Sequence, residues 1–346
     1  MSVLQATGVA PFGSTSPARD SLQPPAGIAG IAGIGYAFPE GNRSVRELAD
    51  DGLLSSDPTV LERFGFERVH VAVHESAYEL ARRAARDALD AAGADPESVG
   101  VLIYGGTPGA LAFAAEHTPE RAAAALRTMD RFKYPATRLQ YDLGLRSAWA
   151  IGVDQLACAT LFGALRVARA LCATEGTERV LCVASERFPD AAGREAIFNC
   201  TSDAACAVLL ERGAARGRIV AATQVTKGYY WDCDAKEAEI VASYFPTAKH
   251  VIERTVAEAG WSLADVDWVI PHNVSARSWE ILLGLVRLPN ARIWSAGVAR
   301  DGHTLAGDNF INLKDASDAG AVQPGERLLL FSYGFGAHWT GLAVVA

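Results

Sequence analysis

Three side chains in this sequence could together carry an acyl group as a covalent thioester and pass it on: Cys158, His272 and His303. A cysteine thiolate is a nucleophile, and histidines transfer protons or donate hydrogen bonds to an oxygen that gains charge. Cys158 lies in VDQLACATLFGALRVARAL, where apolar residues recur at helical spacing. We therefore place Cys158 in the first turn of a buried helix, whose unpaired N–H groups favour the thiolate. The alternative is an unreactive cysteine in the core.

The two histidines follow different signals. His272 comes directly after the apolar strand WVIP, at the end of a strand where α/β folds present residues to ligands. His303 follows Gly302 and opens a segment that corresponds to the Cys158 helix in a second copy of the fold. Each could instead be a structural histidine in a loop. Near the C-terminus, the glycines of SYGFGAHWTG could expose backbone N–H groups as an oxyanion hole, or simply form a tight turn.

The chain contains two related halves. Three pairs of segments match in the same order: VLIYGG (101–106) with WVIPHN (268–273), ATLFG (159–163) with HTLAG (303–307), and ERVLCVASE (178–186) with ERLLLFSYG (326–334). The strands are continuous apolar runs, as expected for sheets that are covered on both faces. We predict an α/β fold of two duplicated halves, residues 27–218 and 219–346, in five layers: helix, sheet, helix, sheet, helix. An insertion around 108–131 lengthens the first half.

Composition excludes several other classes of protein. The chain has 346 residues, half of them hydrophobic, and a formal charge of −8, which argues against nucleic acid as a partner. We find no run of about 18 apolar residues that would span a membrane, and no secretion signal. Six cysteines without metal-ligand spacing indicate reduced thiols and a cytoplasmic protein, with no metal or resident cofactor. Residues 1–26 are expected to form a mobile tail.

One basic cluster stands out against the negative net charge. It consists of Arg121, Arg127, Arg131, Lys133, Arg138 and Arg146. Its residues either form a solvated helix face or provide a docking site for an acidic partner such as an acyl carrier protein.

These motifs also resemble the ketoacyl-ACP synthase III branch of the thiolase superfamily, from about Ile28 to Ala346. The opening GIGYAFPEGNRSVREL, the nucleophile segment ACATLFGAL and the segment PHNVSARSWE resemble motifs of that family in the same order. So do DGHTLAGDNFINL and the closing VQPGERLLLFSYGFGAHWTG. The resemblance implies a thiolase-like fold, a homodimer, and a substrate carried as a thioester on the phosphopantetheine of an acyl carrier protein or on coenzyme A.

Residue by residue, the resemblance makes Cys158 the nucleophile and His272 the catalytic histidine. It assigns the oxyanion hole to the N–H of Cys158 and an N–H at Gly336 or Ala337. Two positions depart from the family. His303 replaces an Asn, although related elongating synthases use Cys-His-His, and Thr59 replaces a tryptophan that stacks on the adenine of coenzyme A.

The departures favour an acyltransferase, which passes the acyl group from Cys158 to a hydroxyl, an amine or a carrier protein in polyketide-type secondary metabolism. The alternative is a ketoacyl-ACP synthase III that condenses the acyl group with a malonyl thioester. Two rivals are a cysteine hydrolase, against which the duplication argues, and a catalytically silent partner subunit, against which the retained cysteine argues.

Overall fold

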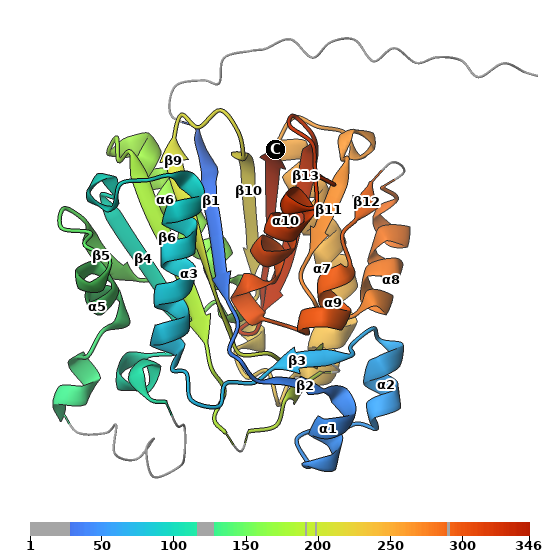
Figure 1. Cartoon of the computed structure of the whole chain (residues 1–346). Helices are drawn as coiled ribbons and strands as arrows, with labels where there is room; N and C mark the ends of the chain where they lie inside the picture. Colours follow the sequence, from blue (N-terminus) through green and yellow to red (C-terminus); the bar gives the residue numbers. More distant parts are fainter. Residues whose placement is uncertain (1–27, 116–127, 191, 198, 289–290) are drawn as a thin grey trace, which may run out of the picture.

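The structure is a computed structural model that describes residues 28–115, 128–190, 192–197, 199–288 and 291–346 (Figure 1). The predicted tail over residues 1–26 therefore lies outside the described residues. So do residues 116–127 of the predicted insertion, together with Arg121 and Arg127 of the basic cluster.

The first half of the fold contains both strands and helices. Its elements are β1 (Ala29–Ala37), β2 (Asn42–Ser44), α1 (Val45–Asp50), α2 (Pro58–Arg63), β3 (Arg68–His70), α3 (Ala77–Ala92), β4 (Val101–Gly106), α5 (Pro135–Asp142), β5 (Trp149–Gly152), α6 (Thr160–Thr174), β6 (Arg179–Glu186), β7 (Glu195–Ala196), β8 (Asn199–Cys200) and β9 (Ala204–Arg212). Short 3₁₀ turns lie at Pro96–Ser98, Gly109–Phe113, Thr128–Phe132 and Ala157–Ala159.

The second half repeats this order with fewer additions. Its elements are β10 (Arg218–Thr226), α7 (Glu237–Glu258), β11 (Trp268–Pro271), α8 (Ala276–Val286), β12 (Arg292–Ile293), α9 (Ala296–Asp301), α10 (Asp308–Asp318), β13 (Arg327–Gly334) and β14 (His338–Val345). Its 3₁₀ turns lie at Gly228–Tyr230, Leu263–Asp265 and Leu305–Gly307.

The sheet confirms the duplicated fold. The strand order β5-β4-β6-β9-β1 in the first half is matched by β12-β11-β13-β14-β10 in the second. All three pairs of matching segments therefore fall on equivalent elements: β4 with β11, the start of α6 with the approach to α10, and β6 with β13. The two sets of strands join into one ten-stranded sheet through the pair Gly30 and Arg218. The exact division of the chain at 218 and 219 stays a prediction.

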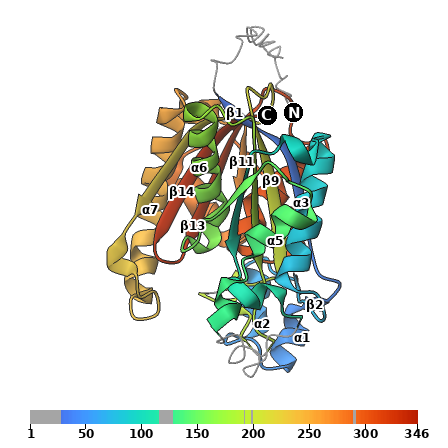
Figure 2. The ribbon, with the colours of Figure 1, turned by 90° about the vertical axis from the view of Figure 1, so that its left-hand side faces the viewer.

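The five predicted layers are present, and α6 and α10 form the middle one. The rings of Phe162 on α6 and Phe310 on α10 lie 5.5 Å apart, within a core that also contains Ile103 of β4 and Leu330 of β13. Successive residues of a strand face opposite sides, so Leu102 of β4 instead packs in the core under α3 and α5. Helices α7 and α8 cover the outer face of the second set of strands. Figure 2 shows the layers edge-on, with α7 on one outside and α3 on the other.

Within the described residues, one helical stretch, Ala157–Thr174, is long and apolar enough to cross a membrane by length and composition alone. Its mean hydropathy is 1.3, and it contains two charged residues, Arg166 and Arg169. This stretch includes α6, and 56% of it is buried inside the protein. Its place between the two sets of strands explains its apolar composition, in agreement with the buried helix predicted from the sequence.

A buried ion pair fixes the loop that leads from β6 to β9. Both terminal nitrogens of Arg194 donate to the carboxylate of Asp203, at 2.7 and 3.0 Å. The side chains are 2% and 0% exposed. Asp203 also accepts hydrogen bonds from the N–H groups of Ala72 and Phe188. This loop carries Ile197 and Asn199 into the pocket described below.

We predict that Arg194→Leu lowers the free energy of unfolding by about 3–5 kcal/mol, because it leaves the Asp203 carboxylate buried without a counter-charge. Urea unfolding measures the difference. The matched control is Arg46→Leu, which removes an exposed pair with Glu62 at 2.7 Å and should cost about 1 kcal/mol or less. Equal small losses in both variants would contradict the role assigned to the buried pair.

Candidate active site

Cys158 lies at the entrance to α6, but not within its first α-helical turn. It occupies the 3₁₀ turn Ala157–Ala159, and α6 begins at Thr160. Gln155 and Ala157 have positive φ angles of 68° and 46°, which interrupt the helical backbone before Thr160. Such backbone strain costs about 1–3 kcal/mol per residue and concentrates at functional sites. The Cys158 side chain is buried, and its carbonyl accepts a hydrogen bond from Oγ of Ser332 at 3.1 Å.

His303 contacts the nucleophile directly. Its Nε2 lies 3.1 Å from Sγ of Cys158, and its Nδ1 lies 2.6 Å from Oδ2 of Asp308. Both residues of the His303–Asp308 pair are buried. A cysteine, a histidine and a carboxylate in this sequence of contacts form a nucleophile, a base and the group that orients the base.

Asp308 was not among the site residues predicted from the sequence. This carboxylate accepts hydrogen bonds from the N–H and Oγ1 of Thr304 and from the N–H of Asn273, at 2.6–2.7 Å. It therefore ties the His303 turn to the loop that holds His272. In the sequence, Asp308 stands five positions after His303, at the start of the α10 helix. Acidic residues are common at helix starts, so the sequence does not distinguish this aspartate from an ordinary one.

The charge on His303 depends on these neighbours. Burial opposes protonation, but the Asp308 carboxylate and then Cys158 outweigh it and raise the pKa of His303 well above its ordinary value. A protonated His303 would stabilise a Cys158 thiolate at 3.1 Å by charge and by hydrogen bonding.

His272 has the opposite character. Burial, and then the neighbouring His303, lower its pKa to about 4, so the ring is neutral near pH 7. Its Nδ1 lies 3.1 Å from the carbonyl oxygen of Phe331, which can only accept, so Nδ1 carries the proton. Its Nε2 is buried and has no hydrogen-bond partner among the described residues. That nitrogen is therefore a free acceptor, and the two imidazole rings lie 6.4 Å apart.

The glycine-rich hairpin between β13 and β14 packs against the Cys158 turn. A Cβ at Gly334 would lie 2.0 Å from the carbonyl oxygen of Leu156, so only glycine fits there. The N–H of Gly336 donates to Sγ of Cys233 at 3.1 Å. This backbone amide, which was predicted for the oxyanion hole, therefore already has a hydrogen-bond partner. Ala337 is buried in the same turn at φ 67°. The oxyanion assignment to Cys158, Gly336 and Ala337 stays a prediction.

A pocket of about 300 Å³ leads to the nucleophile. Cys158 and His303 line it, together with Asn199, residues of α7 and α8, and the hairpin residues Tyr333 and Phe335. Arg277 and the exposed Ile281 lie among the α8 residues of this pocket. Thus two of the three predicted catalytic residues share a single pocket, and His272 is not among its lining residues and is fully buried.

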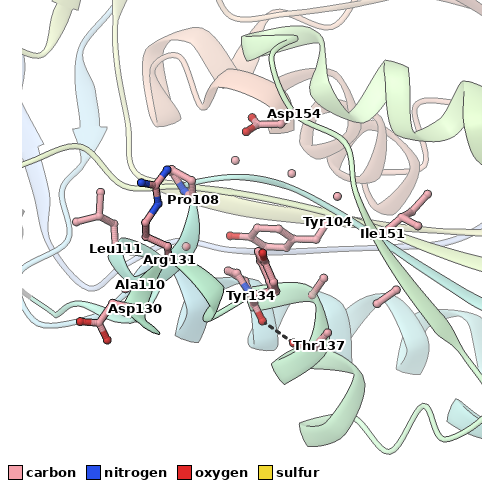
Figure 3. Close-up of a pocket in the computed structure, with 17 residues that line it drawn as sticks. Tyr104, Pro108, Ala110, Leu111, Asp130, Arg131, Tyr134, Thr137, Ile151 and Asp154 are labelled. Carbon is pink, nitrogen blue, oxygen red and sulfur yellow. Dashed lines mark hydrogen bonds between the residues drawn. The ribbon is translucent and has the colours of Figure 1, made fainter. Parts of the chain in front are cut away.

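A second cavity, of about 580 Å³, lies at the carboxyl ends of β4 and β5. Tyr104, Arg131 and Tyr134 lie on one side of it and Asp154 lies across from them (Figure 3). Parts of the predicted insertion, Pro108–Leu111 and Asp130–Arg131, also line it. Cys158 and the two histidines do not.

The basic cluster and Thr59 are placed away from the nucleophile's contacts. Lys133, Arg138 and Arg146 each pair with an acidic side chain, at 2.6, 2.9 and 3.4 Å. Because their charges are partly neutralised by these pairs, the three residues fit the predicted solvated face better than the predicted docking site for an acidic partner. Thr59 lies on α2, where its hydroxyl donates to the carboxylate of Asp57 at 2.5 Å.

Comparison with known proteins adds to this geometry. The profile of 3-oxoacyl-[acyl-carrier-protein] synthase III matches residues 154–228, and its C-terminal counterpart matches residues 256–346. A β-ketoacyl-[acyl-carrier-protein] synthase III of Rhizorhabdus wittichii is 28% identical over 334 residues, which span 91% of this chain and 98% of the relative.

Solved structures share the fold over nearly the whole chain. The 3-oxoacyl-[acyl-carrier-protein] synthase III of Aquifex aeolicus VF5 aligns with a TM-score of 0.76 at 21% identity, covering 92% of this chain and all of the other. The acyltransferase ChlB3 aligns with a TM-score of 0.77 at 21% identity, covering 92% of this chain and 98% of the other.

We predict that Asp308→Asn slows the alkylation of Cys158 by iodoacetamide about 10-fold or more at pH 7. Without the carboxylate, the pKa of His303 falls, so the imidazolium that stabilises the thiolate is lost, and the pH–rate profile moves to higher pH. Mass spectrometry of the peptide that contains Cys158 follows the reaction. Asp318→Asn, which removes an exposed carboxylate at the other end of α10, is the control. An unchanged profile in Asp308→Asn would contradict the ion pair.

Proposed function

Since the chain belongs to the ketoacyl-ACP synthase III family of the thiolase superfamily, we propose that it is an acyltransferase that carries its acyl group on Cys158. The observation that carries this proposal is the chain of contacts from Sγ of Cys158 through His303 to Asp308. The fold accommodates both reactions considered, because solved structures with this fold are described as synthases and as an acyltransferase.

In the first half-reaction, the Cys158 thiolate attacks the carbonyl carbon of a donor thioester. The new S–C bond forms, the donor's C–S bond breaks, and the leaving thiolate takes the proton held on Nε2 of His303. Asp308 keeps His303 oriented throughout and stabilises its charged form. The N–H of Cys158 and an N–H of the glycine-rich hairpin would bind the oxyanion.

In the second half-reaction, a hydroxyl or amine of the acceptor attacks the acyl-Cys158 thioester. Its proton must move to a base as the new bond forms and the bond to Sγ breaks. Nε2 of His272 can accept this proton, because the ring is neutral near pH 7 and this nitrogen has no proton of its own. The proton then passes to His303, which lost its own in the first step and lies beside Sγ, so the next cycle again starts from a thiolate and a charged His303.

The same details weigh against decarboxylative condensation. An enolate formed from a malonyl thioester needs hydrogen-bond donors at its oxygen. The contact with Phe331 leaves Nε2 of His272 without a proton, so it accepts rather than donates. Condensation therefore remains the alternative function. A silent partner subunit is a weaker one, because Cys158 and its base are retained, and the duplicated thiolase-like fold argues against a papain-like hydrolase.

We further propose an acyl carrier protein as the donor, in polyketide-type secondary metabolism, because Thr59 offers no aromatic face for adenine. The paired state of the basic cluster gives this choice no added support. A homodimer through the first-half sheet would cover the edge strand β5 and its exposed Trp149, beside the second cavity. The free thiols fit a cytoplasmic location.

We predict that intact-mass spectrometry with a competent acyl thioester shows one acyl adduct in the wild type and none in Cys158→Ala. The reason is that Cys158 is the cysteine that contacts a histidine held by a carboxylate. Cys233→Ala, which removes the least buried of the six thiols, should keep the adduct. An adduct on any other residue would overturn the proposal.

The roles of the two histidines can be separated in single-turnover experiments. We predict that His272→Asn leaves acylation of Cys158 within a few-fold of wild type but slows transfer to the acceptor about 10²-fold or more, because an amide cannot act as a base. His303→Asn should slow both steps. Wild type should release little carbon dioxide from a malonyl thioester. Rapid decarboxylation with unimpaired transfer in His272→Asn would assign the protein to condensation instead.

A further inference from the structure

Most polar side chains of the pocket that reaches Cys158 already have partners within the protein. Ser275 and Ser278 bond to each other at 2.8 Å, and Arg277 pairs with Glu280 at 2.6 Å. The one histidine that lines the pocket contacts the nucleophile and the buried carboxylate described above. A ligand in this pocket therefore meets few hydrogen-bonding groups that are not already engaged.

Two side chains of the lining, Asn199 and Tyr244, are free to bind a ligand. Both are partly exposed, and neither makes a side-chain hydrogen bond within the described part of the chain. Their polar atoms are also not enclosed, in contrast to the buried, unpaired hydroxyl of Tyr333. The amide of Asn199 and the hydroxyl of Tyr244 can therefore be reached by a molecule that enters the pocket.

These two groups lie beside the nucleophile on different elements. Asn199 is on β8, directly before Cys200, whose carbonyl accepts a hydrogen bond from the N–H of His303 at 2.8 Å. Tyr244 is on α7, and burial raises its pKa, with a smaller contribution from the charge of Cys158. The phenol therefore keeps its proton near neutral pH and donates a hydrogen bond, whereas the amide can donate or accept one.

The pocket offers no carboxylate to an ammonium group. Among the described residues that line it there is no aspartate and no glutamate. Once Cys158 carries an acyl group its thiolate charge is gone, and Arg277 leaves the pocket positive. Burying an ammonium without a carboxylate is strongly unfavourable, whereas a hydroxyl requires only hydrogen bonds. A thiol is a poor match for an amide and a phenol, since sulfur forms weak hydrogen bonds.

We propose that the acceptor is an uncharged alcohol, and that Asn199 and Tyr244 bind its hydroxyl beside the acylated Cys158. The inference rests on the proposed function, because the acyl group must first be carried on Cys158. The alcohol oxygen forms a bond to the acyl carbon, the bond from that carbon to Sγ breaks, and the hydroxyl proton passes to Nε2 of His272. The product is an ester, and amines are excluded at neutral pH by their charge.

Transfer from acyl-Cys158 to benzyl alcohol and to benzylamine tests the choice of acceptor. The two molecules have nearly the same shape, but the amine is protonated at pH 7. Wild type should transfer to the alcohol about 10-fold or more faster, although amines attack free thioesters faster than alcohols do. Tyr244→Phe should raise the alcohol concentration for half-maximal transfer about 10-fold, because one hydrogen bond to the acceptor is lost. Tyr141→Phe, at an exposed tyrosine outside the pocket, is the control.

Two thiol reagents measure the same selectivity without acyl transfer. 2-Hydroxyethyl and 2-aminoethyl methanethiosulfonate differ only in whether they end in a hydroxyl or an ammonium. Their rates with Cys158, each divided by the rate with N-acetylcysteine, should differ about 10-fold or more in favour of the hydroxyl. Val241→Glu, which places a carboxylate at an exposed position of the lining, should remove most of this difference. The matched Val241→Gln should keep it.

The outcomes separate this inference from the acyl-transfer proposal. Equal normalised rates of the two reagents in wild type, faster transfer to benzylamine, or an unchanged alcohol dependence in Tyr244→Phe would each overturn the inference. Acylation of Cys158, and with it the proposed function, would stand in all three cases. Selective reaction with the hydroxyethyl reagent, but no acylation of Cys158 by any thioester, would instead sink the proposed function while supporting the charge selectivity of the pocket.

Discussion

The active site depends on one buried carboxylate, that of Asp308. A charge removed from water is strongly unfavourable unless hydrogen bonds and an opposite charge compensate it. Here the compensation comes from two N–H groups, one hydroxyl and the ring of His303. Because these donors belong to the His303 turn and the His272 loop, satisfying the carboxylate also sets the positions of both histidines. Proton transfer at Cys158 is thus linked to the packing of α10 and the end of β11.

The two imidazoles differ because their surroundings differ. His303 has an anion on one side and a sulfur on the other, so its pKa rises. His272 is fully buried and lies beside His303, so its pKa falls, although the hydrogen bond to the carbonyl of Phe331 opposes the shift. Two histidines in one site can therefore hold different protonation states at the same pH. The sequence does not contain this distinction, because it depends on which atom faces each ring nitrogen.

The sequence predicted the duplicated fold well, because buried parallel strands are continuous apolar runs that align between the halves. It also identified Cys158 and His303, which the structure brings into contact, and His272 nearby. It did not identify Asp308, whose role requires the turn at Leu305–Gly307, nor the positive φ angles that delay the start of α6. The pocket that leads to Cys158 was equally hidden, since its walls come from segments that lie far apart in the chain.

The strand order of the two halves has a further consequence for how such a site can arise. In the matched segments ATLFG and HTLAG, His303 stands opposite Ala159, the neighbour of Cys158. A half-length chain that paired with its own copy would present identical residues at both helix entrances, and so could not place a thiol at one and an imidazole at the other. Fusion into a single chain removes that symmetry constraint. The residues at each helix entrance can then change independently. Point substitutions can therefore give one active site with a thiol at one entrance and an imidazole at the other.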